Sequence, residues 1–196
     1  MSPAAEILAV CTGNVCRSPL TERLLRAGLE TRWGPAASDV VVHSAGTRAL
    51  VGRPMVAESE SRLADRGGDA TGFAARQLEA QMTRSATLVL ALTRAHRAAV
   101  VEEHPLAARY TFTLREIARL LADVAPSDVP GDTPADRVRG LASLASRRRG
   151  LLPPVPPDED DVIDPYGGDA ARHDLAGAQI TPAVGELLRL LAPTAR

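Results

Sequence analysis

The stretch ILAVCTGNVCRSP, residues 7–19, places both cysteines of the chain in one loop between an apolar run and a Ser-Pro pair. The apolar run, residues 7–10, is typical of a buried strand, and leucines recur on one helical face between Pro19 and Trp33. Ser18 is suited to cap that helix with its hydroxyl group, and Pro19 suits the first turn, where its missing N–H group costs nothing. We therefore predict that the chain opens as a strand, a loop and a helix.

The same alternation of short apolar runs and helical patterns continues along the chain. We predict further strands at residues 40–42, 87–92 and 110–113, and further helices at residues 54–66, 94–103 and 114–124. Apolar residues at helical spacing between Val184 and Leu191 predict a closing helix, with Thr181 and Pro182 as its cap or as a kink. Strands that alternate with helices favour an α/β fold, a parallel sheet with helices on both faces.

Residues 125–161 have a different texture, with seven prolines around the run Arg147-Arg148-Arg149. We expect a loop or an insertion that holds one short helix at residues 136–146. The arginine run favours a solvated basic tip over a partner site. The segment either alters access to a neighbouring site or is disordered.

The overall composition limits the classes of function. With 196 residues, the chain is long enough for one domain with a substantial core. A formal net charge of −1, an aromatic content of 3% and scattered arginines disfavour nucleic-acid binding. No apolar run approaches the roughly 20 residues of a membrane span, and the first residues lack the pattern of a signal peptide. We therefore expect a cytoplasmic protein, in which two cysteines five residues apart favour reactive chemistry over a structural bridge.

The loop after the first predicted strand has the composition of an anion site. Cys11 stands at the carboxyl end of that strand, where open α/β sheets bind their ligands, and Gly13 allows a backbone conformation that a β-carbon would resist. If the N–H groups from Thr12 to Arg17 point into one cradle, they bind a tetrahedral oxyanion such as phosphate. The same positive field favours a thiolate at Cys11, and the planar guanidinium of Arg17 can hold two oxygen atoms of the anion.

Simpler interpretations of the two cysteines compete with this one. A lone cysteine after a strand is usually a small apolar filler. A cysteine followed after five residues by arginine and serine, between a strand and a helix, is a much narrower combination and favours a nucleophile in a phosphate-binding loop. Cys16 is equally well explained as a filler or as a reserve thiol that captures oxidised Cys11 in a disulfide.

The loop sequence CTGNVCRSP, residues 11–19, resembles the signature of the low-molecular-weight protein tyrosine phosphatases. Five other blocks resemble family motifs in the family's order: SAGT at 44–47, VGRP at 51–54, ARQL at 75–78, LTRAHR at 92–97 and DPYG at 164–167. The resemblance covers nearly the whole chain apart from the proline-rich segment. It implies a flavodoxin-like, three-layer αβα sandwich around a four-stranded parallel sheet, in a single domain over residues 1–196 with an insertion at about 125–161.

The resemblance also implies roles for individual residues. Cys11 matches the nucleophile that takes the phosphoryl group, Arg17 the residue that binds it, and Asp164 the general acid and base. The residues that it implies for substrate binding are Thr12, Gly13, Asn14, Val15, Cys16, Ser18, Leu50 and Tyr166. Ser44, together with Asn14 and Ser18, matches the polar residues that keep the loop in shape. Two positions depart from the pattern. Where some relatives carry a histidine that is linked to the loop asparagine, this chain has Phe73, with Ala74 next to it. Leu50 stands where eukaryotic members often have an aromatic residue.

Phosphotyrosine in a protein is the substrate that the resemblance implies, with a bacterial tyrosine kinase as one partner. Protein arginine phosphatases resemble the loop but carry threonine in place of Val15, and the arsenate reductases of this scaffold rely on downstream cysteines, of which this chain has none after Cys16. A non-catalytic anion-binding module is disfavoured because Cys11, Arg17 and Asp164 are all present. We expect no cofactor and no metal, because the four histidines show no ligand spacing with the cysteines and thiolate attack on phosphorus needs no metal.

Overall fold

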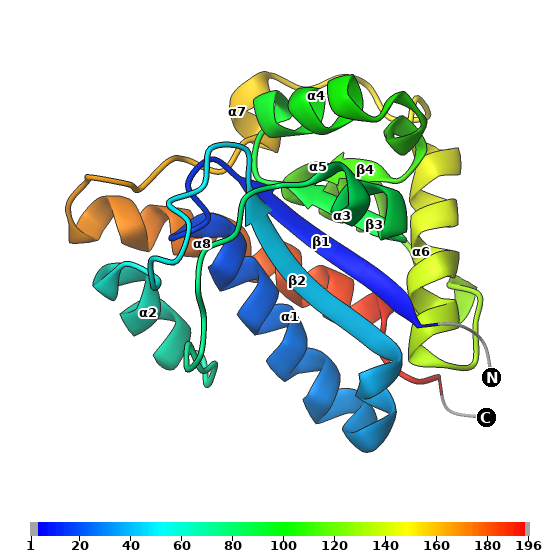
Figure 1. Ribbon diagram of the computed structural model, residues 1–196. Coiled ribbons are helices and arrows are strands. Elements are labelled where there is room, and N and C mark those ends of the chain that lie inside the picture. Colours follow the sequence, from blue (N-terminus) through cyan, green and yellow to red (C-terminus); the bar gives the residue numbers. More distant parts are fainter. Residues whose placement is uncertain (1–3, 195–196) are drawn as a thin grey trace.

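The computed structural model describes residues 4–194 and has a four-stranded parallel sheet at its centre (Figure 1). The strands are β1 (Ala5–Cys11), β2 (Val40–Gly46), β3 (Leu88–Ala91) and β4 (Thr111–Thr113), in the order β2-β1-β3-β4. Neighbouring strands are parallel throughout, and Ala9 lies opposite Ser44 on one side and Leu90 on the other. This sheet confirms the predicted α/β class.

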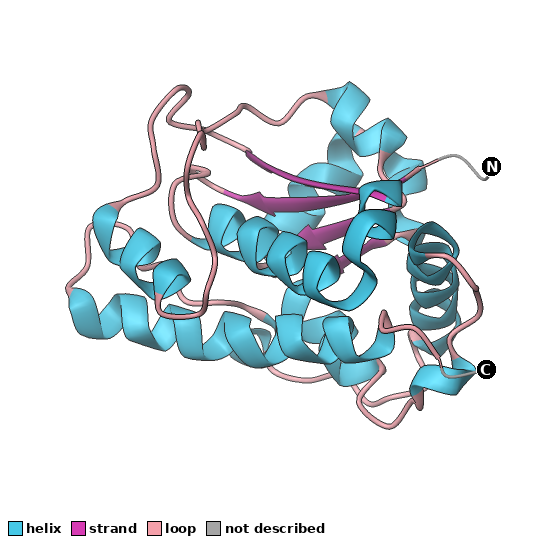
Figure 2. Cartoon of the chain, turned by 90° about the horizontal axis from the view of Figure 1, so that it is seen from below, coloured by secondary structure: helices cyan, strands magenta, loops and turns pink. Residues whose placement is uncertain are grey.

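Helices cover both faces of the sheet (Figure 2). One face carries α1 (Arg17–Trp33), α5 (Leu114–Leu120) and α8 (Ala170–Leu190), and the other carries α3 (Ala80–Ser85) and α4 (Arg94–Glu103). α2 (Ala57–Ala64) packs on α1 and α8, and α7 (Pro157–Asp160) packs on α5. The 3-10 turns are η1 (Gly34–Asp39), η2 (Pro105–Arg109) and η3 (Pro126–Asp128).

The two faces have separate cores because successive residues of a strand point in opposite directions. Ile7 lies in the larger core with Leu25 of α1 and Leu187 of α8. Leu8 lies in the smaller core with Val100 of α4. A strand that is covered on both faces is apolar at every position, which explains the unbroken run at residues 7–10. The run ends at Cys11, so the reactive loop begins at the carboxyl edge of the sheet.

The predicted order of strands and helices is confirmed, with differences in detail. α4 has the predicted bounds, whereas α3 was not predicted, because its six residues are too few to show a helical period. α2 begins at Ala57, later than predicted, because the residues before it are extended and tied to the loop: the N–H of Val56 donates to the carbonyl of Val15 at 3.0 Å.

One predicted helix start is wrong, and of the two alternatives for Thr181 and Pro182, cap or kink, the cap is wrong. Ser18 does not cap α1, because the helix already begins at Arg17 and the Ser18 hydroxyl instead lies 2.9 Å from Cys11 Sγ. Thr181 and Pro182 do not cap the last helix, because α8 begins at Ala170, where the Asp169 side chain accepts a hydrogen bond from the N–H of Arg172, and Pro182 lies inside the helix.

The proline-rich segment is ordered, so the alternative of disorder is wrong. Its helix α6 (Pro134–Arg148) is longer than predicted and lies beside the start of β1 (Figure 1). Arg137 of α6 is 1% exposed and donates hydrogen bonds to the carbonyls of Pro126, Val129 and Leu190. These bonds join the segment to the end of α8.

The arginine run is only partly a solvated tip. Arg148 donates to the carbonyl of Leu120 at 2.6 Å and pairs with Asp123. Arg149 pairs with Glu116 at 3.0 Å, and its guanidinium lies 4.0 Å from the centre of the Phe112 ring. The expectation of a solvated run is therefore wrong for these two arginines, because neighbouring elements supply carbonyl, carboxylate and aromatic partners that a charge run in the sequence does not reveal.

Candidate active site

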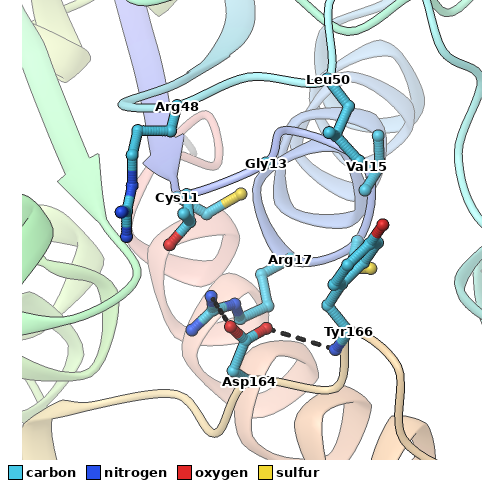
Figure 3. Close-up of a pocket in the computed structure, with 10 residues that line it drawn as sticks. Cys11, Gly13, Val15, Arg17, Arg48, Leu50, Asp164 and Tyr166 are labelled. Carbon is cyan, nitrogen blue, oxygen red and sulfur yellow. Dashed lines mark hydrogen bonds and ion pairs between the residues drawn. The ribbon is translucent and has the colours of Figure 1, made fainter.

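A cavity of about 260 Å³ opens where β1 ends and α1 begins (Figure 3). It is lined by Cys11, Thr12, Gly13, Val15, Cys16, Arg17, Arg48, Leu50, Asp164 and Tyr166. The side chains of Asn14, Ser18 and Ser44 are fully buried and hydrogen-bond to one another behind the loop. The structure thus brings the predicted catalytic residues into one cavity, adds Arg48, and places three of the predicted polar residues as supports of the loop.

The loop turns at Asn14. Its φ is 54°, in the left-handed region, whereas Gly13 is not left-handed and a β-carbon there would only make ordinary contact with Val15 at 3.6 Å. Asn14 Oδ1 accepts a hydrogen bond from the N–H of Arg76 at 2.7 Å, and Nδ2 donates to Ser44 Oγ at 2.8 Å. The expectation for Gly13 is therefore wrong, since asparagine tolerates this conformation and here its carboxamide is fixed on both sides.

The support behind the loop continues to a buried carboxylate that the sequence analysis missed. Ser44 Oγ donates to Glu22 Oε2 at 2.6 Å, and Glu22 is 2% exposed. The guanidinium of Arg76 lies 3.6 Å from the same oxygen, which offsets part of the cost of burying the charge. Phe73, at the position that departs from the family pattern, lies under the guanidinium of Arg23 with 5.6 Å to the ring centre. The sequence did contain a signal for Glu22, because this glutamate lies one turn after Ser18 on the apolar side of α1.

Two groups hydrogen-bond to the Cys11 sulfur, and both can donate to a thiolate. The N–H of Asn14 donates to Cys11 Sγ at 3.3 Å, and the Ser18 hydroxyl lies 2.9 Å from it. Donors of this kind stabilise negative charge on sulfur. Cys16 has the opposite environment, because burial is the main cause that raises the pKa of its thiol to about 12. The Cys16 thiol therefore stays protonated at neutral pH.

Arg17 and Asp164 face each other in the cavity (Figure 3). Arg17 Nη2 lies 3.0 Å from Asp164 Oδ2, and Arg17 Nη1 donates to the carbonyl of Val162 at 3.1 Å. Arg17 Nε is buried and has no hydrogen-bond partner among residues 4–194, which leaves a donor for an anion in the cradle. The segment that carries Asp164 is held by Arg172, whose Nε donates to the Asp164 carbonyl at 2.6 Å.

His96 contacts the loop from α4. Its Nε2 lies 2.8 Å from Thr12 Oγ1 and its Nδ1 lies 2.9 Å from Thr93 Oγ1, so both ring nitrogens are satisfied. Burial, followed by the charge of Arg17, lowers the pKa of His96 to about 4, so the ring is neutral at physiological pH. His96 is therefore a satisfied structural residue, and its contact with Thr12 links α4 to the loop.

The cavity contains groups that can bind an anion and a thiol that can act as a nucleophile. Among residues 4–194, no group of three or more histidine, cysteine or acidic side chains is placed to hold a metal ion. In the same part of the chain, no helix is long and apolar enough to cross a bilayer. The side chains that are present supply a thiol, a guanidinium and a carboxylate around one point.

The chain is similar to known phosphatases. The family model of low molecular weight phosphotyrosine protein phosphatase matches residues 6–130. The low molecular weight protein-tyrosine-phosphatase Etp of Escherichia coli K12 is 42% identical over 99 residues, which are 50% of this chain and 62% of Etp. A protein-arginine-phosphatase of Geobacillus stearothermophilus is 38% identical over 110 residues, which are 56% of this chain and 69% of that protein.

Solved structures extend the likeness to the rest of the chain. The YwlE arginine phosphatase from Geobacillus stearothermophilus superposes with a TM-score of 0.65 and 26% identity, over 94% of this chain and 90% of that chain. The tyrosine phosphatase Wzb from Escherichia coli K30 has the same fold, with a TM-score of 0.66, 20% identity and coverage of 96% and 99%.

This chain belongs to the low molecular weight phosphotyrosine protein phosphatase family. The matched residues cover 62% of the length of Etp. Asp164 lies beyond the last residue of the family match, so its assignment depends on its position over the loop.

Proposed function

We propose that the protein is a metal-independent phosphatase that hydrolyses phosphotyrosine in proteins through a phosphocysteine intermediate. The observation that carries this proposal is the 3.0 Å contact of Arg17 with Asp164 in the cavity that Cys11 also lines, because a thiol, a guanidinium and a carboxyl group in one cavity can serve as nucleophile, anion clamp and proton donor.

In the first step, the Cys11 thiolate attacks phosphorus and the bond from phosphorus to the tyrosine oxygen breaks. The leaving oxygen takes its proton from Asp164, which must be protonated at that moment. Charge that develops on the phosphoryl oxygens is stabilised by the N–H groups of the loop and by Arg17, whose buried Nε has no other partner among residues 4–194.

In the second step, water attacks the phosphocysteine while Asp164, now a carboxylate, removes its proton. The bond from phosphorus to sulfur breaks, which returns the thiolate and releases inorganic phosphate. Asp164 suits both steps because its side chain is 50% exposed and therefore accessible to substrate and to water.

The walls of the cavity support an aryl phosphate as the substrate. Val15, Leu50 and Tyr166 line it beside the thiol, and Leu50 and Tyr166 are 39% and 59% exposed, so that a ring can lie between them. Apolar side chains at these positions suit a tyrosine ring better than a guanidinium group. The 38% identity with a protein-arginine-phosphatase makes phosphoarginine the competing substrate.

The test compares phosphotyrosine and phosphoarginine versions of one peptide, in EDTA, with the wild type, Cys11→Ser and Asp164→Asn. We expect cleavage of phosphotyrosine, no turnover by Cys11→Ser, and a loss of on the order of 10²-fold to 10⁴-fold in kcat for Asp164→Asn. The loss should be smaller for a dinitrophenyl phosphate, because that leaving group needs less help from an acid.

Each other outcome rejects part of the proposal. A preference for phosphoarginine rejects the binding of a tyrosine ring between Leu50 and Tyr166 and assigns the protein as an arginine phosphatase. Turnover by Cys11→Ser at the wild-type rate rejects the nucleophile. An equal loss in Asp164→Asn with both leaving groups rejects the role of Asp164 as a general acid.

A further inference from the structure

Arg48 is a cavity residue that the proposed reaction does not use. It lines the cavity with Cys11, Thr12 and Gly13, its side chain is exposed, and it has no side-chain partner among residues 4–194. Figure 3 shows Arg48 on one side of Cys11, with Leu50, Val15 and Tyr166 on the other side. A free guanidinium beside an anion site calls for an anionic partner on the substrate.

The backbone that carries Arg48 is fixed to the phosphate-binding loop. The N–H groups of Thr47, Arg48 and Leu50 donate to the carbonyls of Cys11, Thr12 and Gly13 at 2.9, 3.0 and 3.0 Å. Gln77 holds the same turn from outside, because its Oε1 accepts from the N–H of Ala49 and its Nε2 donates to the carbonyl of Thr47. The backbone of Arg48 is therefore held at a fixed position relative to Cys11.

Arg53 is a second arginine without a side-chain partner among residues 4–194, and it lies beyond Val15, Leu50 and Tyr166. A neighbouring hollow shares Val15, Leu50 and Tyr166 with the cavity and continues to Arg53. Arg53 is exposed and, within the part of the chain that the structure describes, its side chain has no partner. A peptide whose phosphotyrosine ring lies between Leu50 and Tyr166 thus passes Arg48 on one side of the ring and Arg53 on the other.

The acidic side chain that lines the cavity does not compensate these two charges. Of the charged side chains that line the cavity and the neighbouring hollow, Arg17, Arg48 and Arg53 are cationic and Asp164 is acidic. Asp164 pairs with Arg17 at 3.0 Å. The charged lining is therefore net positive, although the whole chain has a formal net charge of −1.

We propose, on the basis of the phosphatase activity proposed above, that Arg48 and Arg53 make the enzyme select phosphotyrosines that have anionic groups on both sides in the substrate chain. The chemistry that they recognise is a carboxylate or a second phosphoryl group within reach of each guanidinium. This site sets substrate preference and takes no part in the bond changes.

The test measures kcat/KM for a set of phosphotyrosine peptides that differ only in the flanking residues: glutamates, glutamines, lysines, or a second phosphotyrosine on either side. We expect the wild type to prefer the glutamate peptide over the glutamine peptide by on the order of tenfold, which is the combined effect of two partly exposed ion pairs. Salt at about 0.5 M should reduce this ratio, because exposed charges are screened.

Variants assign the preference to the two arginines. Arg48→Gln and Arg53→Gln should each lower the ratio of glutamate to glutamine peptide, and the double variant should bring it close to one. The ratio is taken within each protein, so a loss of folded enzyme does not affect it. Arg84→Gln is the matched control and should keep the wild-type ratio. Arg84 is an exposed arginine on α3, which precedes the amino end of β3, whereas the cavity lies at the carboxyl ends of the strands.

The outcomes separate this inference from the proposed function. If the wild type does not hydrolyse p-nitrophenyl phosphate or any of the peptides, the proposed function fails. If it hydrolyses them without a preference for anionic flanks, or if the double variant keeps the preference, only this inference is overturned. A preference for the doubly phosphorylated peptide alone supports the inference and assigns the second phosphoryl group as the feature that is recognised.

Discussion

Acid should destabilise the fold through His96. This side chain is 6% exposed and bonded to Thr12 and Thr93, and burial lowers its pKa from 6.5 to about 4. Between these pH values the unfolded chain binds the proton more tightly than the folded chain does. The contribution of His96 to the free energy of unfolding is therefore largest above pH 6.5 and falls as the pH falls toward 4.

The gap between the two pKa values fixes the size of the effect. It corresponds to about 3 kcal/mol over the whole pH window, of which about 2 kcal/mol is lost by about pH 5. The assay is unfolding by urea at about pH 7 and pH 5 for the wild type, His96→Gln and His104→Gln. His43, whose pKa is also lowered by burial, is present in all three proteins, so its contribution cancels.

We expect the wild type and His104→Gln to lose about 2 kcal/mol more than His96→Gln does between the two pH values. His96→Gln is less stable at pH 7 as well, because it loses the ring that joins Thr12 to Thr93, and only its pH dependence bears on the argument. If His96→Gln shows the same pH dependence as the wild type, the claim that His96 is buried as a neutral ring in the folded protein is refuted.

Three further substitutions test the supports of the site. Ser44→Ala should lower the free energy of unfolding by about 2 kcal/mol and reduce kcat/KM, because the buried Glu22 carboxylate and Asn14 amide lose the hydroxyl that joins them. The control Ser38→Ala, at an exposed serine, should change the free energy of unfolding by less than about 0.5 kcal/mol. Equal losses in the two variants would contradict the network. Arg149→Met should lower the free energy of unfolding by about 2 kcal/mol, because it leaves the Glu116 carboxylate without its ion-pair partner. Arg147→Met, in the same run, should leave the free energy of unfolding nearly unchanged. A larger loss in Arg147→Met than in Arg149→Met would contradict the pairing of Arg149 with Glu116. Gly13→Ala should raise KM for phosphotyrosine peptides several-fold with little change in stability, because its β-carbon enters the slot; an unchanged KM would place the ring elsewhere.

The sheet and the reactive loop could be predicted because their signals are local. An apolar run followed by CTGNVCRS determines a strand, a turn and a helix start within a dozen residues or so, and the contacts of Cys11 with Asn14 and Ser18 lie inside that span. The turn residue was nevertheless misassigned, since glycine is the usual left-handed residue and the bonds that hold Asn14 come from Ser44 and Arg76, which are distant in the sequence.

The remaining features depend on contacts between distant segments. Arg48 and Glu22 carry no motif of their own, and their positions follow from the pairing of residues 47–50 with the loop and from the packing of α1. The proline-rich segment did contain a readable helix start: Thr133 caps α6, and Pro134 occupies its first turn. The density of prolines around it hid that signal, and the carbonyl partners of Arg137 could not be read from spacing.

The most direct test of the central claim is the detection of a phosphoryl group on Cys11. Asp164→Asn should accumulate this intermediate, because water lacks its general base while the thiolate still attacks. The variant is mixed with a dinitrophenyl phosphate, quenched in acid, digested and analysed by mass spectrometry, with Cys11→Ala/Asp164→Asn as the control. We predict one added phosphoryl group on the peptide that contains Cys11, and none in the control. A phosphoryl group on another residue, or hydrolysis that persists in the control, would contradict the mechanism.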